Sequence, residues 1–138
     1  MLVKFNDIAR TYGIPNGVIH IGAHKMQERS DYIGFGIKNI LWVEANPSLY
    51  DEAKAIIGDS ESESIYSFAA SDNDHMVYKF KIGSDDQASS IFDFFLHKNN
   101  YPHIYTKKTI SVKSKRMDTL IKEESIDISK YNFLNFSL

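Results

Sequence analysis

The chain has no cysteine among its 138 residues, so it cannot form disulfide bonds, thiolate nucleophiles or cysteine-based zinc sites. This fits a reducing compartment, and we expect the cytoplasm. An excess of positive charge is also lacking: 16 Lys and Arg against 18 Asp and Glu give a net charge of -2. Without a basic surface to hold a phosphate backbone, nucleic acid is a poor candidate partner, and a small molecule is a better one.

Long apolar runs are missing as well. Nowhere does the sequence approach the roughly 18 to 20 consecutive apolar residues of a membrane span, and the opening "MLVKFNDIAR" lacks the apolar segment of a signal peptide. We therefore expect no membrane partner. The chain is 43% hydrophobic, and at this length it fits one domain, residues 1–138, with a substantial core.

The first half of the chain alternates between strand and helix patterns. "GVIHIGA" and "NILWVEA" are nearly continuous runs of apolar β-formers, as expected of strands buried on both faces. Helical spacing or capping predicts helices over residues 5–12, 26–35 and 47–57. The third helix has the clearest ends, with Asn46 as cap, Pro47 at the first position and Gly58 just beyond.

The second half continues as an α/β pattern. A third strand is predicted to end at Ser71, alternating strands follow over 75–82 and 108–116, and a helix and a last apolar strand occupy 117–126 and 131–138. A loop and an aromatic-rich connector lie between the two alternating strands. The order predicts a mostly parallel sheet with an inserted β-hairpin.

A ligand site is predicted after the first strand. In open α/β sheets the ligand lies beyond the carboxyl ends of the strands, and the first strand-to-helix turn needs small residues. Gly22 and Ala23 occupy that turn, and Glu44 closes the second strand 22 positions after Gly22, near the roughly 20 expected of an acid that binds ribose hydroxyls. His24 and Gln27 break the G-x-G-x-x-G series, which disfavours NAD or FAD.

Each of these residues also has a purely structural explanation. Gly22 could serve helix packing, Glu44 could be a solvated carboxylate, and the "SDND" stretch that contains Asp72 could be a plain turn. Spacing alone leaves both explanations open.

The wording of several segments resembles the FkbM family of S-adenosylmethionine-dependent methyltransferases. "GVIHIGAHKMQE", "ILWVEANPSLY", "AASD", "SSIFDF", "RMDTLI" and "YNFLN" occur in that family's order, over nearly the whole chain. The resemblance implies a Rossmann-like class I methyltransferase fold, incomplete at the C-terminus, with the fourth strand beside the first. It also implies S-adenosylmethionine as cofactor and a saccharide or small-metabolite hydroxyl as methyl acceptor.

The resemblance also implies roles for particular residues. Gly22, Ala23 and His24 would line the methionine part of the cofactor, Glu44 would hold the ribose hydroxyls, and Ser71 and Asp72 would lie near the adenine. Ala45 and Asn46 complete this cofactor-binding set.

Three positions depart from the family pattern. Met26 replaces the usual glycine and is expected to narrow the space at the helix start, His20 replaces an acid found in many relatives, and Ser137 stands in the position of an acid next to the reaction centre.

His24 is the candidate general base, because its turn faces the ligand and imidazole is the side chain that most often transfers protons near neutral pH. A polar loop histidine without a catalytic task is the alternative. His20 fits a hydrogen-bonded core histidine better than a base. No His, Asp and Glu set has the spacing of a metal site, so no metal is expected.

Two functions follow. The first is a methyltransferase, and the second is an inactive truncated relative that acts as a cofactor-binding or assembly module. If the last strand lies at the sheet edge, its unpaired backbone groups predict self-association through that edge.

Overall fold

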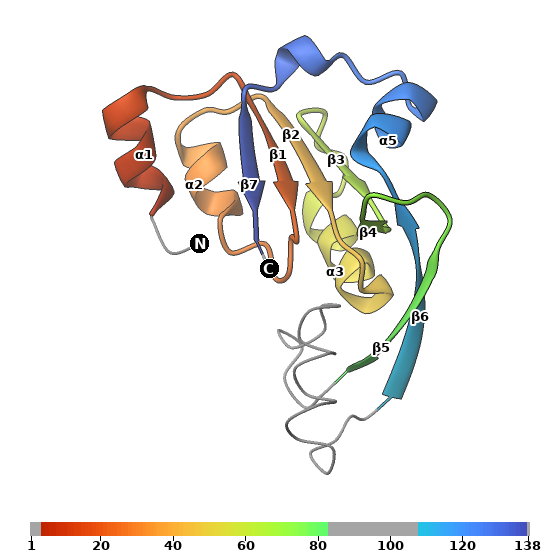
Figure 1. Cartoon of the computed structure of the whole chain (residues 1–138). Helices are drawn as coiled ribbons and strands as arrows, with labels where there is room; N and C mark the ends of the chain where they lie inside the picture. The colour runs from red at the N-terminus through yellow and green to blue at the C-terminus, as the bar shows by residue number, and fades with distance from the viewer. Residues whose placement is uncertain (1–3, 83–107, 138) are drawn as a thin grey trace.

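Four parallel strands form the main sheet, in the order β3-β2-β1-β7. The structure is a computed structural model that describes residues 4–82 and 108–137, so most of the loop and the aromatic connector predicted after residue 82 lie outside the described residues. The strands of this sheet are β1 (Gly17–Ile21), β2 (Asn39–Val43), β3 (Glu63–Tyr66) and β7 (Phe133–Phe136). The α/β class and the parallel sheet are confirmed, and the last strand lies beside the first (Figure 1).

The helices alternate with these strands. They are α1 (Phe5–Tyr12), α2 (Arg29–Gly34), α3 (Pro47–Ile57) and α5 (Met117–Glu123), and a short 3-10 helix, η2 (Ile128–Lys130), precedes β7. The capping prediction for α3 is confirmed: the Asn46 side chain accepts a hydrogen bond from the Ser48 amide, with Pro47 at the first helical position.

Helix α2 starts three residues later than the sequence pattern predicts. Met26 has a φ of 63°, in the left-handed region, so it cannot belong to a right-handed helix. Residues 22–28 instead form a tight turn, in which the Met26 amide donates to the Ala23 carbonyl at 2.8 Å. Tyr32 is the only buried residue of the short helix that remains.

The two faces of the main sheet bury different clusters. Alternation along β1 puts Val18 on one face, against apolar residues of α1, α2 and α3. Ile19 and Ile21 lie on the other face, where they join Phe68 and Leu120 of α5. The carboxyl ends of β1, β2 and β7 lie at the same edge of the sheet because the strands are parallel.

A second, smaller sheet has the order β4-β6-β5. Its strands are β4 (Ala69–Ala70), β5 (Val77–Ile82) and β6 (Lys108–Lys115), with β5 and β6 antiparallel. The sequence pattern predicts one continuous strand up to residue 70, whereas the chain leaves the main sheet after Tyr66. Ala69 and Ala70 pair with Ser114 and Lys115 of β6 instead.

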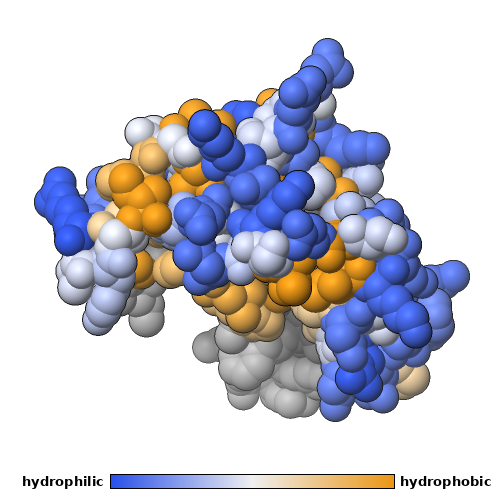
Figure 2. All heavy atoms as spheres, turned by 90° about the horizontal axis from the view of Figure 1, so that it is seen from above, coloured by the Kyte–Doolittle hydropathy of each residue, from blue (hydrophilic) through white to orange (hydrophobic). Residues whose placement is uncertain are grey.

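Strand β7 is an edge strand, and no other described strand pairs with its outer side. Leu134 and Phe136 on this strand are 62% and 55% exposed. Elsewhere, too, apolar side chains reach the surface among hydrophilic ones, as the view from above shows (Figure 2). None of the described helices has the length and apolar character needed to cross a bilayer.

Candidate functional site

The turn after β1 is held tightly by its neighbours. Gly22 has a φ of 89°, and a Cβ on it would lie only 2.1 Å from the Ser137 carbonyl oxygen. The amides of Gly22 and Ala23 donate to the Val43 carbonyl at 2.9 and 3.2 Å. A glycine is therefore required here by the backbone that follows β7, and these two amides bond to β2.

The carboxylate of Glu44 joins the two loops that follow β1 and β2. Its Oε1 accepts a hydrogen bond from the His24 amide at 2.8 Å, and its Oε2 accepts one from the Asn46 amide at 2.8 Å. Glu44 is 5% exposed, so this is a buried carboxylate fixed by backbone donors. A carboxylate has about four acceptor sites, so acceptor capacity remains on both oxygens.

The other residues predicted around this turn differ in exposure. Ala23 and Asn46 are buried, whereas Gly22, His24 and Ala45 are partly exposed. The His24 Nδ1 atom is buried and has no hydrogen-bond partner in the described part of the chain. Only Nε2 of this imidazole could therefore reach a substrate.

Met26 lies at the start of the turn into α2, but its side chain packs in the core. It is 6% exposed and belongs to the cluster that contains Ala23 and Tyr32. Its thioether does not line the cleft described below, and the expectation that it narrows the ligand space at the helix start stays a prediction.

His20 is confirmed as a hydrogen-bonded core histidine. It is fully buried, and its Nδ1 lies 2.7 Å from the Tyr32 hydroxyl. Burial lowers the pKa of His20 to about 4, so the ring is neutral at pH 7. A base at this position would have no access to a substrate.

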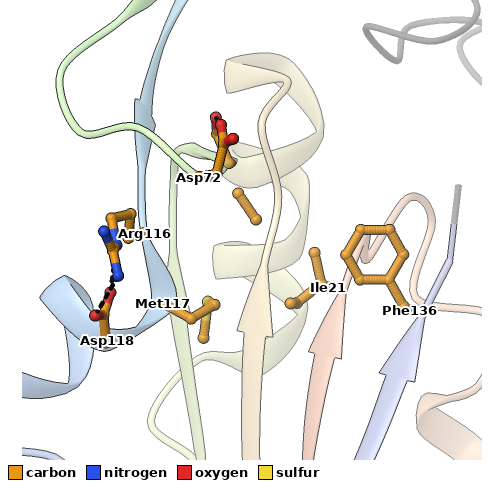
Figure 3. Close-up of a pocket in the computed structure, with 8 residues that line it drawn as sticks. Ile21, Asp72, Arg116, Met117, Asp118 and Phe136 are labelled. Carbon is orange, nitrogen blue, oxygen red and sulfur yellow. Dashed lines mark hydrogen bonds and ion pairs between the residues drawn. The ribbon is translucent and has the colours of Figure 1, made fainter.

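A cleft of about 540 Å³ opens at the carboxyl ends of β1 and β7. Its lining residues come from four segments and are Ile21, Ala70, Ser71, Asp72, Arg116, Met117, Asp118 and Phe136. Figure 3 shows Met117 and Phe136 on opposite sides, with Ile21 between them and Asp72 on the loop after β4. The cleft thus combines apolar side chains with a rim of charged ones.

The rim is held by short ion pairs and hydrogen bonds. Arg116 donates to Asp118 through Nε at 2.9 Å and Nη2 at 2.8 Å. Asp74 accepts from the Arg116 amide and the Thr119 hydroxyl, which fixes the start of α5 and lowers the pKa of Asp74. Asp72 is exposed, and its carboxylate accepts a hydrogen bond from Asn73 at 2.8 Å.

The structure divides the predicted cofactor residues between two neighbouring places. His24, Glu44 and Asn46 are hydrogen-bonded together, and Ser71 and Asp72 line the cleft. Glu44 does not line the cleft, but it directly follows Val43, the register partner of the lining residue Ile21. Within the described residues, no group of three His, Asp or Glu side chains could hold a metal ion.

Sequence reasoning missed the walls of the cleft. Met117 and Arg116 lie in "RMDTLI", a segment that carries the family resemblance, and this was a usable signal. Alternation along the last strand puts Leu134 and Phe136 on one face, and Phe136 is the residue of this pair nearer the carboxyl end, where the ligand site is expected. This was a second usable signal.

Comparison with known proteins adds no relative. No family model, curated protein or solved structure matches the chain.

Proposed function

We propose that the chain is an S-adenosylmethionine-dependent methyltransferase domain of the FkbM type, which methylates a hydroxyl of a saccharide or small metabolite. The observation that carries the proposal is the Glu44 carboxylate, held at the carboxyl end of β2 by the amides of His24 and Asn46. A fixed buried carboxylate with acceptor capacity fits vicinal ribose hydroxyls. The strand order supports the proposal, because it places β7 beside β1.

The cofactor would extend from the cleft to Glu44. Met117 and Phe136 offer apolar surface to an adenine ring, and Asp72 can accept a hydrogen bond from its amino group. The turn of Gly22, Ala23 and His24 would then lie along the methionine part. In this proposal the antiparallel pair of β5 and β6 is the inserted hairpin of the family.

The residues of the chain would mainly align the reactants. The bound cofactor supplies an activated methyl group, and in-line displacement requires the acceptor oxygen to be held opposite the sulfur. His24 would take the proton of the acceptor hydroxyl through Nε2, which would leave the acceptor oxygen free to act as the nucleophile. Ser137, which replaces an acid, supplies no carboxylate to this reaction.

Calorimetric titration with S-adenosylhomocysteine tests the binding step. We expect binding in the micromolar to millimolar range, and Glu44→Ala should weaken it by about 1 to 3 kcal/mol through lost charge-assisted hydrogen bonds. Asp72→Asn should weaken it with no loss of stability, because Asp72 is exposed. Asp59→Asn is a matched control, since this exposed residue follows α3 at the opposite edge of the sheet. No binding at millimolar ligand would refute the proposal.

The second candidate function is a non-catalytic assembly module. The outer side of β7, which pairs with no described strand, and the exposed Leu134 and Phe136 favour it, because edge strands pair readily with other chains. Methyl transfer to any hydroxyl acceptor would exclude this alternative.

A further inference from the structure

A buried polar network connects α2 with two strands of the sheet. The Tyr32 hydroxyl lies 2.7 Å from His20 Nδ1 on β1 and accepts a hydrogen bond from the Asn135 side chain on β7, also at 2.7 Å. His20 and Tyr32 are both 0% exposed, and Asn135 is 6% exposed. His20 and Asn135 are register partners on β1 and β7, which lie side by side in the sheet (Figure 1), so the network links α2 to both strands.

The protons of this network can be assigned from its donors and acceptors. The Asn135 amide nitrogen can only donate, so the Tyr32 oxygen accepts from it. The single hydroxyl proton of Tyr32 then goes to His20 Nδ1, which must carry a lone pair. The ring proton of neutral His20 is consequently on Nε2, which lies 3.9 Å from the Glu28 carboxylate.

A proton on Nδ1 would disrupt this arrangement. Nδ1 would become a donor, and Tyr32 would receive two donors while its own proton lost its acceptor. The groups around His20 offset this only in part: a backbone hydrogen bond with Gly22 raises the pKa of His20, and the Glu28 carboxylate lies 3.9 Å from Nε2, beyond hydrogen-bond distance. His24 opposes a second positive charge. Burial is the largest cause of the low pKa of His20, about 4.

Helix α2 depends on this contact for its position. Tyr32 is its only buried residue, and the Tyr32 ring packs against Phe5 of α1 and Trp42 of β2. The ion pair between Arg29 and Glu63 is a further contact of α2 with the sheet. We propose that His20, Tyr32 and Asn135 form a proton-sensitive contact that holds α2 on the sheet at neutral pH and releases it when Nδ1 takes up a proton. The opening of α2 would also free the turn that precedes it.

Linkage gives the size and sign of the effect. The pKa of His20 is about 4 in the closed state and rises towards the ordinary histidine value of 6.5 when opening exposes the ring to water, so protons favour opening between these pH values. The opening constant of α2 should therefore rise by up to roughly 300-fold as the pH falls from 6.5 to 4, the ratio for full exposure of the ring. Above pH 6.5 it should not change with pH.

Two measurements on the full chain test the inference. Long-range proton–nitrogen correlation spectra at pH 7.5 should show His20 with a protonated Nε2 and a bare Nδ1; the opposite tautomer would overturn it. Hydrogen exchange, corrected for intrinsic rates, should show α2 amides losing protection below pH 6.5 while β2 amides keep theirs. Equal loss in α2 and β2 would also overturn it, because the release would then be global unfolding.

Variants identify the responsible group. His20→Gln should abolish the pH dependence of α2 exchange, and His75→Gln is the matched control, because His75 is exposed. An unchanged pH dependence in His20→Gln would contradict the inference. If this variant does not fold, the fluorescence of Trp42 in the unaltered chain gives a second readout. Trp42 is the only tryptophan, and its ring centroid is 4.9 Å from that of His20, so protonated imidazole should quench it near pH 4.

Discussion

Replacing Met26 tests the conformation of the turn between β1 and α2. Met26 has a φ of 63°, where a side chain is strained, and yet the side chain is 6% exposed in the core. Two variants separate these effects. Met26→Ala removes the packing but keeps a Cβ, whereas Met26→Gly removes both the packing and the strain.

The magnitudes follow from these two observations. Loss of a buried methionine side chain costs about 2 to 5 kcal/mol, so both variants should be less stable than the unaltered chain. A left-handed conformation costs a residue with a Cβ about 1 to 2 kcal/mol, whereas glycine loses about 0.5 to 1 kcal/mol more backbone entropy on folding. Met26→Gly should therefore be more stable than Met26→Ala by about 0.5 to 1 kcal/mol.

Urea denaturation followed by Trp42 fluorescence measures both variants, because Trp42 is the only tryptophan and is fully buried. The matched control is Leu49, which is buried in α3 in a helical conformation. There the order should reverse, with Leu49→Gly less stable than Leu49→Ala by about 1 kcal/mol. If Met26→Gly is the less stable of its pair, as at Leu49, the left-handed assignment is refuted.

The remaining predictions concern the packing, the charges and the sheet edge. In the same urea assay, Gly22→Ala should lower the free energy of unfolding by at least about 2 kcal/mol, because the new Cβ would lie 2.1 Å from the Ser137 carbonyl oxygen. Gly34→Ala is the control: it has open space around it and should be neutral or stabilising. Burial opposes ionisation of Glu63, but hydrogen bonds from Arg29 and Trp42 lower its pKa below 4.5. The contribution of ionised Glu63 to stability is therefore present above about pH 4.5 and is lost as the pH falls through the lowered pKa. Glu63→Gln should make the free energy of unfolding less dependent on pH below about pH 4.5. An unchanged pH dependence would count against this. Sedimentation should show self-association at micromolar concentration that Leu134→Lys reduces; a monomer under these conditions would contradict pairing through β7.

Local signals predicted the elements whose ends depend on local chemistry. Asn46, Pro47 and Gly58 marked α3 correctly, because caps act within a few residues. The start of α2 was missed, because no short-range rule indicates that Met26 adopts a left-handed φ. The separation of β4 from β3 was also missed, since it depends on pairing between Ala69 and Ser114, which are 45 positions apart.

The turn after β1 explains why the site was only partly predictable. The sequence predicts Gly22 and Glu44 at one ligand site and leaves ligand approach and helix packing open as reasons for the glycine, whereas the structure shows it against the Ser137 backbone. The partners of Glu44 are the amides of His24 and Asn46, and backbone groups are present whatever the residue type. Met26 illustrates the same limit: the family resemblance predicts glycine there, and the chain keeps a backbone conformation typical of glycine while burying a methionine side chain. The conformation of the turn therefore depends on Gly22 together with backbone contacts to Val43 and Ser137, and no short-range rule reveals those contacts.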